Sequence, residues 1–473
     1  MEHRTEKLTR RRFLRAALTL GAGVIAASCT PTPTPTSQPK PTAARQLTAG
    51  PAPPTPTAPP PPTAAPKAVV KVRWWGGVPE ANGPKQAVEA WNKAHPEIQV
   101  EYVQYTNTPE GNVKLDTALM VTGEVDVCSN YGLTLLKKRA DGGQIEPLDA
   151  YLGSFNPEKE FGKTANQWDG KTWALYPYGQ PFFIFVNKKV LDEAGLQVPT
   201  DWTWDEFRAT AKKLVQGSGP QKRWGVILPS FTWAEGPAVY QGGGDFAYKD
   251  KCTTNYDHPL WLKSISARYL LQYVDKIEVT MPEYKAGKLV LQNEFYQGRA
   301  AMMLGGAWLL RYIKDLQALP RDWLTTFAPI PYFPDHPRPY RTGEVSESAA
   351  LAKSSKDKQA AWEFLKWFCT EGYLHMNKHG RLALWKGLSA DQKANAFLEG
   401  FDAARYMDVD AFKRVVLAAE KDFPIQTITT GAAELGALMD EEVGKLLSDA
   451  QKPEQTAANL KKRGDEILSK LCK

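Results

Sequence analysis

The spacing of apolar residues changes between two periods along most of this chain. Short apolar runs predict strands at residues 69–75, 98–105, 125–128, 182–186, 224–228, 302–304 and 349–352. Between them, apolar residues three and four apart predict helices, such as the helix with Ala87, Val88 and Trp91 on one face that ends before Pro96. Alternating strands and helices are typical of a parallel, doubly wound α/β sheet.

The best-defined helix start is at Thr203. Thr203 and Glu206 have the spacing of a capping box, and the next apolar positions, Trp204, Phe207, Ala211 and Leu214, share one helix face. Further helices are expected around 113–121 and 133–140, around 361–368 with Ala361, Phe364, Leu365 and Phe368 inward, and over the tail 432–471. Residues 231–244, with Trp233 and three successive glycines, are expected to form a loop.

The N-terminus predicts export. Residues 16–27 are an apolar segment of about a dozen residues that follows the basic residues Arg10, Arg11, Arg12 and Arg15. This order suits a signal peptide, and the segment is too short to span a membrane. The order TRRRFLR resembles a twin-arginine signal, and Ala26-Ala27-Ser28-Cys29 resembles a lipobox that would make Cys29 the lipidated mature N-terminus. An uncleaved anchor and a plain secretory cleavage are the alternatives.

The next segment predicts a tether. Residues 29–66 begin with Cys29 and are otherwise almost only Pro, Thr and Ala, a composition that does not form a packed core. In polyproline II conformation, at about 3.1 Å per residue, this linker would reach roughly 100 Å. The prediction is a signal peptide at 1–28, a lipidated linker at 29–66, and a folded body held near the outer face of the cell membrane.

Charge and cysteine content narrow the function classes. Residues 1–28 carry six Lys/Arg and two Asp/Glu, so the net charge of +7 falls to +3 without them. That balance, with no basic run interleaved with aromatics, argues against nucleic acid. Cys128, Cys252, Cys369 and Cys472 lack metal-site spacing; folding before export would make disulfides late or absent, and the pairing stays open.

Catalytic motifs are missing from the sequence. There is no G-x-S-x-G, P-loop, dinucleotide glycine motif or H-E-x-x-H. His375 and His379 are four residues apart but lack a third ligand, and they suit a helix end before Gly380. We therefore expect no enzyme activity, no cofactor and no metal.

Aromatic residues follow several predicted strands. In open α/β sheets, ligands bind beyond the carboxyl ends of the strands. The residues at those ends are Trp74, Trp75, Asn130, Tyr131, Trp233 and Trp308. The chain has 15 Trp, and flat indole faces can stack on sugar rings, although each Trp can also be a core residue. Trp74, which alternates with Val70 and Val72, fits a core position as well.

Five blocks of the body resemble one family. They are VRWWGG, GEVDVCSNYGLTLLKKRADGGQIEPLD, KTWALYPYGQPFFIFVNKKVLDEAGL with PTDWTWDEF, FYQGRAAMMLGGAWLL and KDKQAAWEFLKWF. From about Val69 to its end, the chain resembles extracellular solute-binding proteins of bacterial ABC importers, in the sugar-binding family that includes maltose-binding proteins.

The resemblance implies a two-lobed α/β fold of the type II periplasmic-binding-protein kind, with a hinge and an interlobe cleft. The expected lobes are 67–179 with 345–408, and 180–344 with 409–473, with crossovers near 179–181 and 342–344. By position, the resemblance places Trp74, Trp75, Asn130, Tyr131, Gln180, Trp233 and Trp308 at the cleft. Glu344 stands where relatives often have glycine, and residues 426–429 lack a late aromatic that is common in oligosaccharide binders.

The sequence thus predicts a monomeric, membrane-tethered carbohydrate receptor. Sugar rings would stack on Trp75, Trp233 and Trp308, while Gln180, Asn130 and Glu344 would bond hydroxyls. Hinge closure around the sugar would precede docking on the importer's permease subunits. One alternative is a non-sugar solute, such as a peptide, polyamine or glycerophosphodiester, and Glu344 would favour a cationic one. A secreted hydrolase on the same scaffold is the other.

Overall fold

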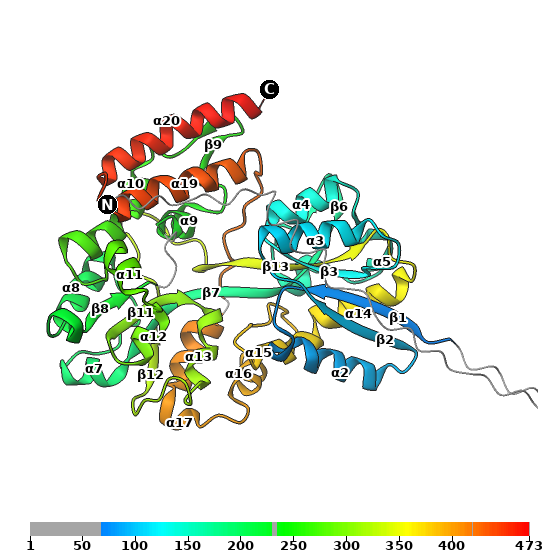
Figure 1. The fold of residues 1–473 in the computed structure, drawn as a ribbon, viewed down its shortest axis with the longest axis horizontal. Helices are drawn as coiled ribbons and strands as arrows, with labels where there is room; N and C mark the ends of the chain where they lie inside the picture. Colours follow the sequence, from blue (N-terminus) through cyan, green and yellow to red (C-terminus); the bar gives the residue numbers. More distant parts are fainter. Residues whose placement is uncertain (1–67, 229–233, 419, 473) are drawn as a thin grey trace, which may run out of the picture. The chain divides into compact units, whose positions relative to one another are not determined.

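The computed structural model describes residues 68–228, 234–418 and 420–472 (Figure 1). Contacts divide the chain into two units, Met1–Ala65 and Pro66–Lys473, and all of the described residues belong to the second. The export signal at 1–28, Cys29, the linker 29–66 and Trp233 lie outside the described residues, so what was predicted for them stays a prediction. Within the described ranges, no helix combines the length and the apolar character that a membrane span requires.

A mixed sheet of nine strands organises this unit. Its order is β2-β1-β3-β13-β7-β11-β8, with β12 also paired to β7 and β4 to β13. The strands are β1 (Val70–Gly76), β2 (Ile98–Gln104), β3 (Val127–Tyr131), β4 (Ile145–Glu146), β7 (Leu175–Asn187), β8 (Trp224–Ile227), β11 (Ala300–Gly306), β12 (Thr325–Ala328) and β13 (Gly343–Ala352). Two short hairpins lie outside it: β5 (Gln167–Trp168) with β6 (Lys171–Thr172), and β9 (Tyr248–Asp250) with β10 (Thr253–Thr254).

Two long strands, β7 and β13, connect the two ends of this sheet. The first half of β7 pairs with β13, its second half pairs with β11 and β12, and β13 also pairs with β3. Figure 1 shows β7 and β13 running side by side at this junction. We call β1 to β4 with their helices the first lobe, and β8, β11 and β12 with their helices the second lobe.

The parallel sheet expected from the sequence exists only within the lobes. β1 is parallel to β2 and β3, and β11 is parallel to β8. The crossing strands are antiparallel to their neighbours, because the chain re-enters the sheet in reverse when it passes between the lobes. The predicted strands at 182–186 and 349–352 are parts of these longer strands.

Helices cover both faces of each half of the sheet. Those of the first lobe are α2 (Pro84–Ala94), α3 (Pro109–Leu119), α4 (Leu133–Asp141), α5 (Asp149–Leu152), α6 (Pro157–Phe161), α14 (Lys358–Cys369) and α15 (Leu374–Asn377). The others are α7 (Lys188–Glu193), α8 (Trp204–Leu214), α9 (Gly236–Gly242), α10 (Pro259–Tyr269), α11 (Met281–Gly287), α12 (Leu291–Tyr296), α13 (Arg311–Lys314), α16 (Ala390–Leu398), α17 (Ala403–Tyr406), α18 (Val409–Ala411), α19 (Ala432–Leu447) and α20 (Pro453–Leu471).

The apolar run at 182–186 shows why both faces need a cover. Phe183 and Phe185 point into one core cluster, while Phe182, Ile184 and Val186 point into the cluster on the opposite face. Successive side chains of a strand point to opposite faces, so a strand covered on both sides is apolar at every position. The sequence-based prediction of a buried strand here is confirmed.

Local signals place some helix ends well and others less well. The predicted capping box is present: Thr203 accepts from the Glu206 N–H, and Glu206 accepts from the Thr203 N–H. α3 starts earlier than expected, because Thr108 caps it and Pro109 opens it. The tail predicted as one helical segment is divided, since Pro453 starts a second helix.

The lobe boundaries proposed from the resemblance stay predictions. Ala394, Phe397 and Met407 pack in the same core cluster as Phe183 and Phe185 of the second lobe. Those contacts favour an end of the first lobe before residue 408.

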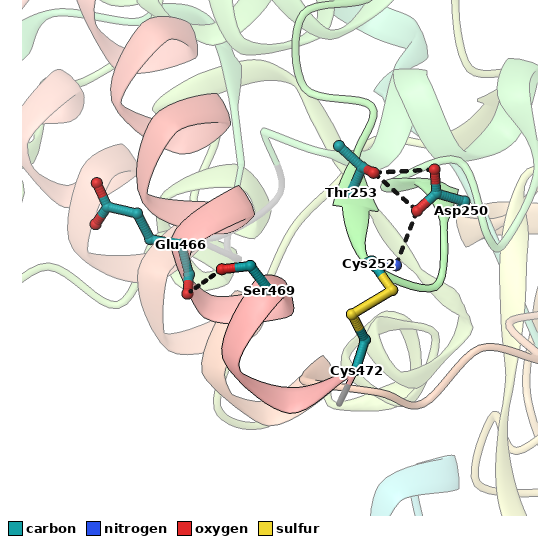
Figure 2. Close-up of a disulfide and its surroundings, with 6 residues drawn as sticks. All are labelled: Asp250, Cys252, Thr253, Glu466, Ser469 and Cys472. Carbon is teal, nitrogen blue, oxygen red and sulfur yellow. Dashed lines mark hydrogen bonds between the residues drawn. A yellow bond between two sulfur atoms is a disulfide. The ribbon is translucent and has the colours of Figure 1, made fainter.

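A disulfide fastens the end of the chain. Cys252, between β9 and β10, is bonded to Cys472, which follows α20, across 220 residues of sequence (Figure 2). Asp250 accepts from the N–H of Cys252, at 2.8 Å, and from the hydroxyl of Thr253. Cys128 and Cys369 are buried free thiols. The disulfide therefore ties the C-terminal helix to the second lobe, a pairing that the sequence left open.

Removing this disulfide should destabilise the folded unit. We expect the C252S/C472S variant to lose about 2–5 kcal/mol of unfolding free energy, because the unfolded chain regains the freedom of a long closed loop. Thermal unfolding with and without reductant measures the effect, and the variant should no longer respond to reductant. Four reactive thiols at 128, 252, 369 and 472 in the denatured, unreduced chain would contradict the pairing.

Candidate ligand-binding site

A cavity of about 840 Å³ opens at the carboxyl ends of the first-lobe strands. Its first-lobe wall includes Gly77 and Val78 after β1, Asn107 after β2 and Tyr131 at the end of β3. The second lobe contributes residues from α9, α10 and α19, together with Pro424, Ile425 and Gln426. This is the location expected for a ligand in an open α/β sheet.

The two strands that connect the lobes, β7 and β13 (the crossing strands), each supply residues of the cavity. Gln180 of β7 lies opposite Glu344 of β13, and its side-chain amide donates to Glu344 Oε1 at 2.7 Å. The preceding residue, Gly343, has φ +127°, and a Cβ on it would lie 2.3 Å from the carbonyl oxygen of Gln180. Only glycine fits this close approach, which holds Glu344 at a defined position in the cavity.

A buried charge network supports the first-lobe side. Arg381 lines the cavity and donates to the Glu347 carboxylate, which also accepts from the Tyr373 hydroxyl at 2.9 Å. The Arg381 guanidinium lies 4.5 Å from the ring centre of Tyr178. Next to it, the Tyr131 hydroxyl accepts from the Gly77 N–H at 2.9 Å. These contacts give the polar groups on this side fixed orientations.

Aromatic side chains make up much of the second-lobe side. They are Tyr240, Tyr248, Tyr256 and Trp261, with Phe182 of β7. Trp261 meets Tyr256 edge to face at 4.9 Å and donates its indole N–H to the carbonyl of Phe246. Most of each ring is buried, so only part of its surface borders the cavity.

The segment at 424–426 is held by Asp245. This carboxylate accepts from the N–H groups of Thr427 and Ile428, at 2.7 and 2.8 Å. Gly244 permits the contact, because a Cβ there would lie 2.1 Å from the carbonyl carbon of Ile425. Pro424, Ile425 and Gln426 therefore form this part of the wall, which has no aromatic side chain.

Two carboxylates in the cavity have raised pKa values. Burial, the charge of Glu344 and then that of Asp440 raise the pKa of Glu235 to about 7. The protein atoms around the cavity raise the pKa of Glu344 as well, although both side chains remain exposed to the cavity's solvent. Both groups are therefore easier to protonate than an ordinary glutamate.

Three of the residues expected from the sequence meet in the cavity: Tyr131, Gln180 and Glu344. Trp308 lies behind it, with its ring over Gly306 and edge to face with Phe182 at 5.2 Å. Trp233 is outside the described residues.

Trp74 and Trp75 are core residues, contrary to the expectation that they contact a ligand. Trp74 packs in the cluster with Phe364 and Phe368, and its indole N–H donates to Ser129. Trp75 packs on the opposite face and donates to the carbonyl of Glu124. Both faces of β1 are covered, so alternation puts each ring into a core and neither lines the cavity.

Asn130 is also removed from the cavity. It is completely buried and accepts from Arg139 at 2.6 Å. Arg139 is likewise buried and donates to Asp116 and Asn112. A buried arginine requires such partners, so Asn130 is used in the core of the first lobe.

Six residues of the cavity were not predicted from the sequence: Glu235, Tyr240, Tyr248, Tyr256, Trp261 and Arg381. Glu235 and Tyr240 belong to the stretch 231–244 that was expected to be a loop, and residues 236–242 of it form α9. The glycines and Pro237 obscured this helix. Nothing local distinguishes Tyr256 or Trp261 from core residues, because the cluster that they share with α9, α10 and α19 places them at the cavity.

His375 and His379 do not form a metal site in the structure. Burial lowers the pKa of both imidazoles. Across the described ranges, no three His, Cys, Asp or Glu side chains are grouped as metal ligands.

Glu235 should make the ligand-free protein less stable as pH rises. It binds its proton up to about pH 7 in the folded state but only to about pH 4.5 in the unfolded state. The folded state thus holds more protons between these values, so the unfolding free energy falls as pH rises through the window. We expect the melting temperature of E235Q, measured at pH 5, 6, 7 and 8, to rise relative to that of the wild type as the pH increases. A constant difference, matching that of the exposed control E466Q, would contradict this.

Comparison with known proteins agrees with this architecture. The family model for bacterial extracellular solute-binding proteins matches residues 75–373. A maltotriose-binding protein from Pyrococcus abyssi is 25% identical over 244 residues, which are 49% of this chain and 48% of that protein. The chain thus spans about half the length of the curated relatives it matches.

Solved structures extend the likeness to the whole fold. A sugar transporter from Rhizobium etli, in an open conformation, has a TM-score of 0.70 at 19% identity, over 84% of this chain and 99% of that one. UgpB from Mycobacterium tuberculosis, in complex with glycerophosphocholine, has a TM-score of 0.67 at 18% identity, over 85% and 99%. The chain has their two-lobed α/β fold and belongs to the family of bacterial extracellular solute-binding proteins.

Proposed function

We propose that this protein captures a carbohydrate, in the size range of an oligosaccharide, in the cavity between its lobes. The observation that carries the proposal is the composition of one cavity: aromatic residues of the second lobe and fixed polar groups of the crossing strands and the first lobe line the same space. The parts of the aromatic rings that border the cavity suit the C–H surface of a sugar, and the polar groups suit its hydroxyls. The similarity to a maltotriose-binding protein supports the same ligand class.

The size of the cavity favours more than one sugar ring. Ligand pockets commonly have volumes of about 300–1,000 Å³, and 840 Å³ is in the upper part of that range. A ligand there would contact Gln180 and Glu344 of the strands that both lobes share. It would stabilise whichever hinge position lets both lobes bind it.

We also propose how the bound solute is delivered to the cell. The ligand-bound protein would dock as a monomer on the permease subunits of an ABC importer. A lipid on Cys29 would hold it at the outer face of the cell membrane, and the linker 29–66 would allow it to move there. The protein would bind its solute without cleaving it.

A binding screen tests the carbohydrate assignment. Tryptophan fluorescence and the melting temperature are followed against mono- and oligosaccharides, and one sugar class should change both in a saturable way. At 100 times its dissociation constant, the sugar should add about 2.7 kcal/mol to the unfolding free energy. Flat signals for all sugars, with a response to a peptide or glycerophosphocholine, would overturn the carbohydrate assignment. Release of new reducing ends would instead identify a hydrolase.

Two glycines of α19 provide a matched test of the cavity. Gly436 and Gly444 both lie inside the helix, and a Cβ on either would meet nothing within 4 Å. Gly436 lines the cavity, and Gly444 does not. We expect G436L to weaken binding of the sugar found in the screen by about tenfold or more, because its side chain fills ligand space.

The G444L variant should bind the sugar within about twofold of the wild type. Both variants should melt at or above the wild-type temperature, because glycine inside a helix costs up to about 1 kcal/mol. Titration calorimetry and thermal unfolding give the two readouts. Equal weakening by both substitutions would argue against ligand binding at this wall.

A further inference from the structure

Two carboxyl groups border the cavity without a basic partner. Glu235 precedes α9 and Glu344 lies on β13, and both line the same space. Among the described residues, neither carboxylate forms an ion pair with Lys, Arg or His, and Glu344 is bonded only by the neutral amide of Gln180. An ionised pair in a partly desolvated site is unfavourable unless a positive charge joins it.

We propose that the ligand of this cavity carries a positively charged amino group that binds at Glu235 and Glu344. Resting on the proposed function, this makes the substrate class an amine-bearing saccharide. An ammonium group donates up to three hydrogen bonds and supplies the positive charge that both carboxylates lack, whereas sugar hydroxyls supply no charge.

The basic residues of the cavity are already engaged elsewhere. Arg381 is bonded to Glu347 and lies over the Tyr178 ring. Arg311 donates to the Tyr312 hydroxyl at 3.0 Å and lies 4.7 Å from that ring's centre. Burial lowers the pKa of His379, which keeps its imidazole neutral near pH 7. Among the described residues, neither arginine forms an ion pair with Glu235 or Glu344.

The surrounding residues also suit a cation. Tyr240, Tyr256 and Trp261 line the same cavity, and aromatic faces attract a positive charge in a partly desolvated site. Asp440, on α19, adds to the negative field at Glu235. The aromatic rings and the Asp440 carboxylate both favour a bound cation, in addition to Glu235 and Glu344.

The raised pKa of Glu235 has two main causes. Burial is the larger one, and the charge of Glu344 is the next. A bound ammonium would remove that repulsion, and both carboxylates would ionise on binding. Proton release on binding is thus an additional signature of the proposed contact.

Calorimetry of the full-length protein at pH 7.5 separates the possibilities. The amine-bearing probes are D-glucosamine, the glucosamine trimer and kanamycin A. The neutral probes are D-glucose, the N-acetylated trimer and maltotriose, and spermidine represents a cation without a sugar. We expect at least one amine-bearing saccharide to bind about tenfold or more tightly than the neutral probe of the same length, and raised salt to weaken it.

Isosteric variants connect this preference to the two carboxylates. E235Q and E344Q, each made separately, should lower the affinity for the amine-bearing saccharide by roughly 10–100-fold, as expected for a lost hydrogen bond to a charged group. Neutral saccharides should change by no more than about threefold. The control E466Q removes an exposed charge on α20 and should change neither affinity (Figure 2).

The outcomes distinguish this inference from the proposed function. Neutral saccharides that bind as tightly as amine-bearing ones, with no selective loss in E235Q and E344Q, would overturn the cation inference and leave carbohydrate binding in place. Binding of spermidine alone, or of no saccharide at all, would overturn the carbohydrate assignment and this inference with it.

Discussion

The pairing of β7 with β13 is the constraint on which the rest of this structure depends. These two strands join the sheets of both lobes, and their register brings Gln180 opposite Glu344. Gly343 makes the approach possible, because any side chain there would overlap the backbone of β7. The same strand pairing therefore connects the lobes and positions the side chains of Gln180 and Glu344 in the cavity. A change in its register would move both of these side chains.

Charges near the cavity are treated in two different ways. Glu347 and Arg139 are buried and each is matched by partners: Arg381 and Tyr373 for the first, Asp116 and Asn130 for the second. These buried charges have fixed positions because each needs its partners: a buried charge without a partner is strongly destabilising. Glu235 and Glu344 are instead exposed to the solvent of the cavity, and partial burial raises the pKa of each. Titratable groups with perturbed pKa values are common at binding sites, where a bound ligand can offset the unfavourable free energy of partial burial.

The second-lobe wall is assembled from segments far apart in the sequence. α9, α10 and α19 share one core cluster, so the rings of Tyr256 and Trp261 and the helix face at Gly436 are positioned together. α20 packs on α19 and on β10, and the disulfide between Cys252 and Cys472 secures its end. The C-terminal helices thus help to shape the cavity as well as to complete the second-lobe core.

The local secondary structure of this protein can be predicted from its sequence. Which side chains line the cavity and which are buried in a core cannot. The capping box at Thr203, the buried run at 182–186 and the stop before Pro96 depend on neighbours in the chain, and each was predicted. The five blocks of family resemblance likewise identified the solute-binding fold. The choice of aromatic residues for the cavity depended on tertiary packing. Alternation in β1 separates Trp74 from Trp75, but only the helices packed on both faces decide that both rings are buried, while α9, α10 and α19 together turn Tyr256 and Trp261 toward the cavity.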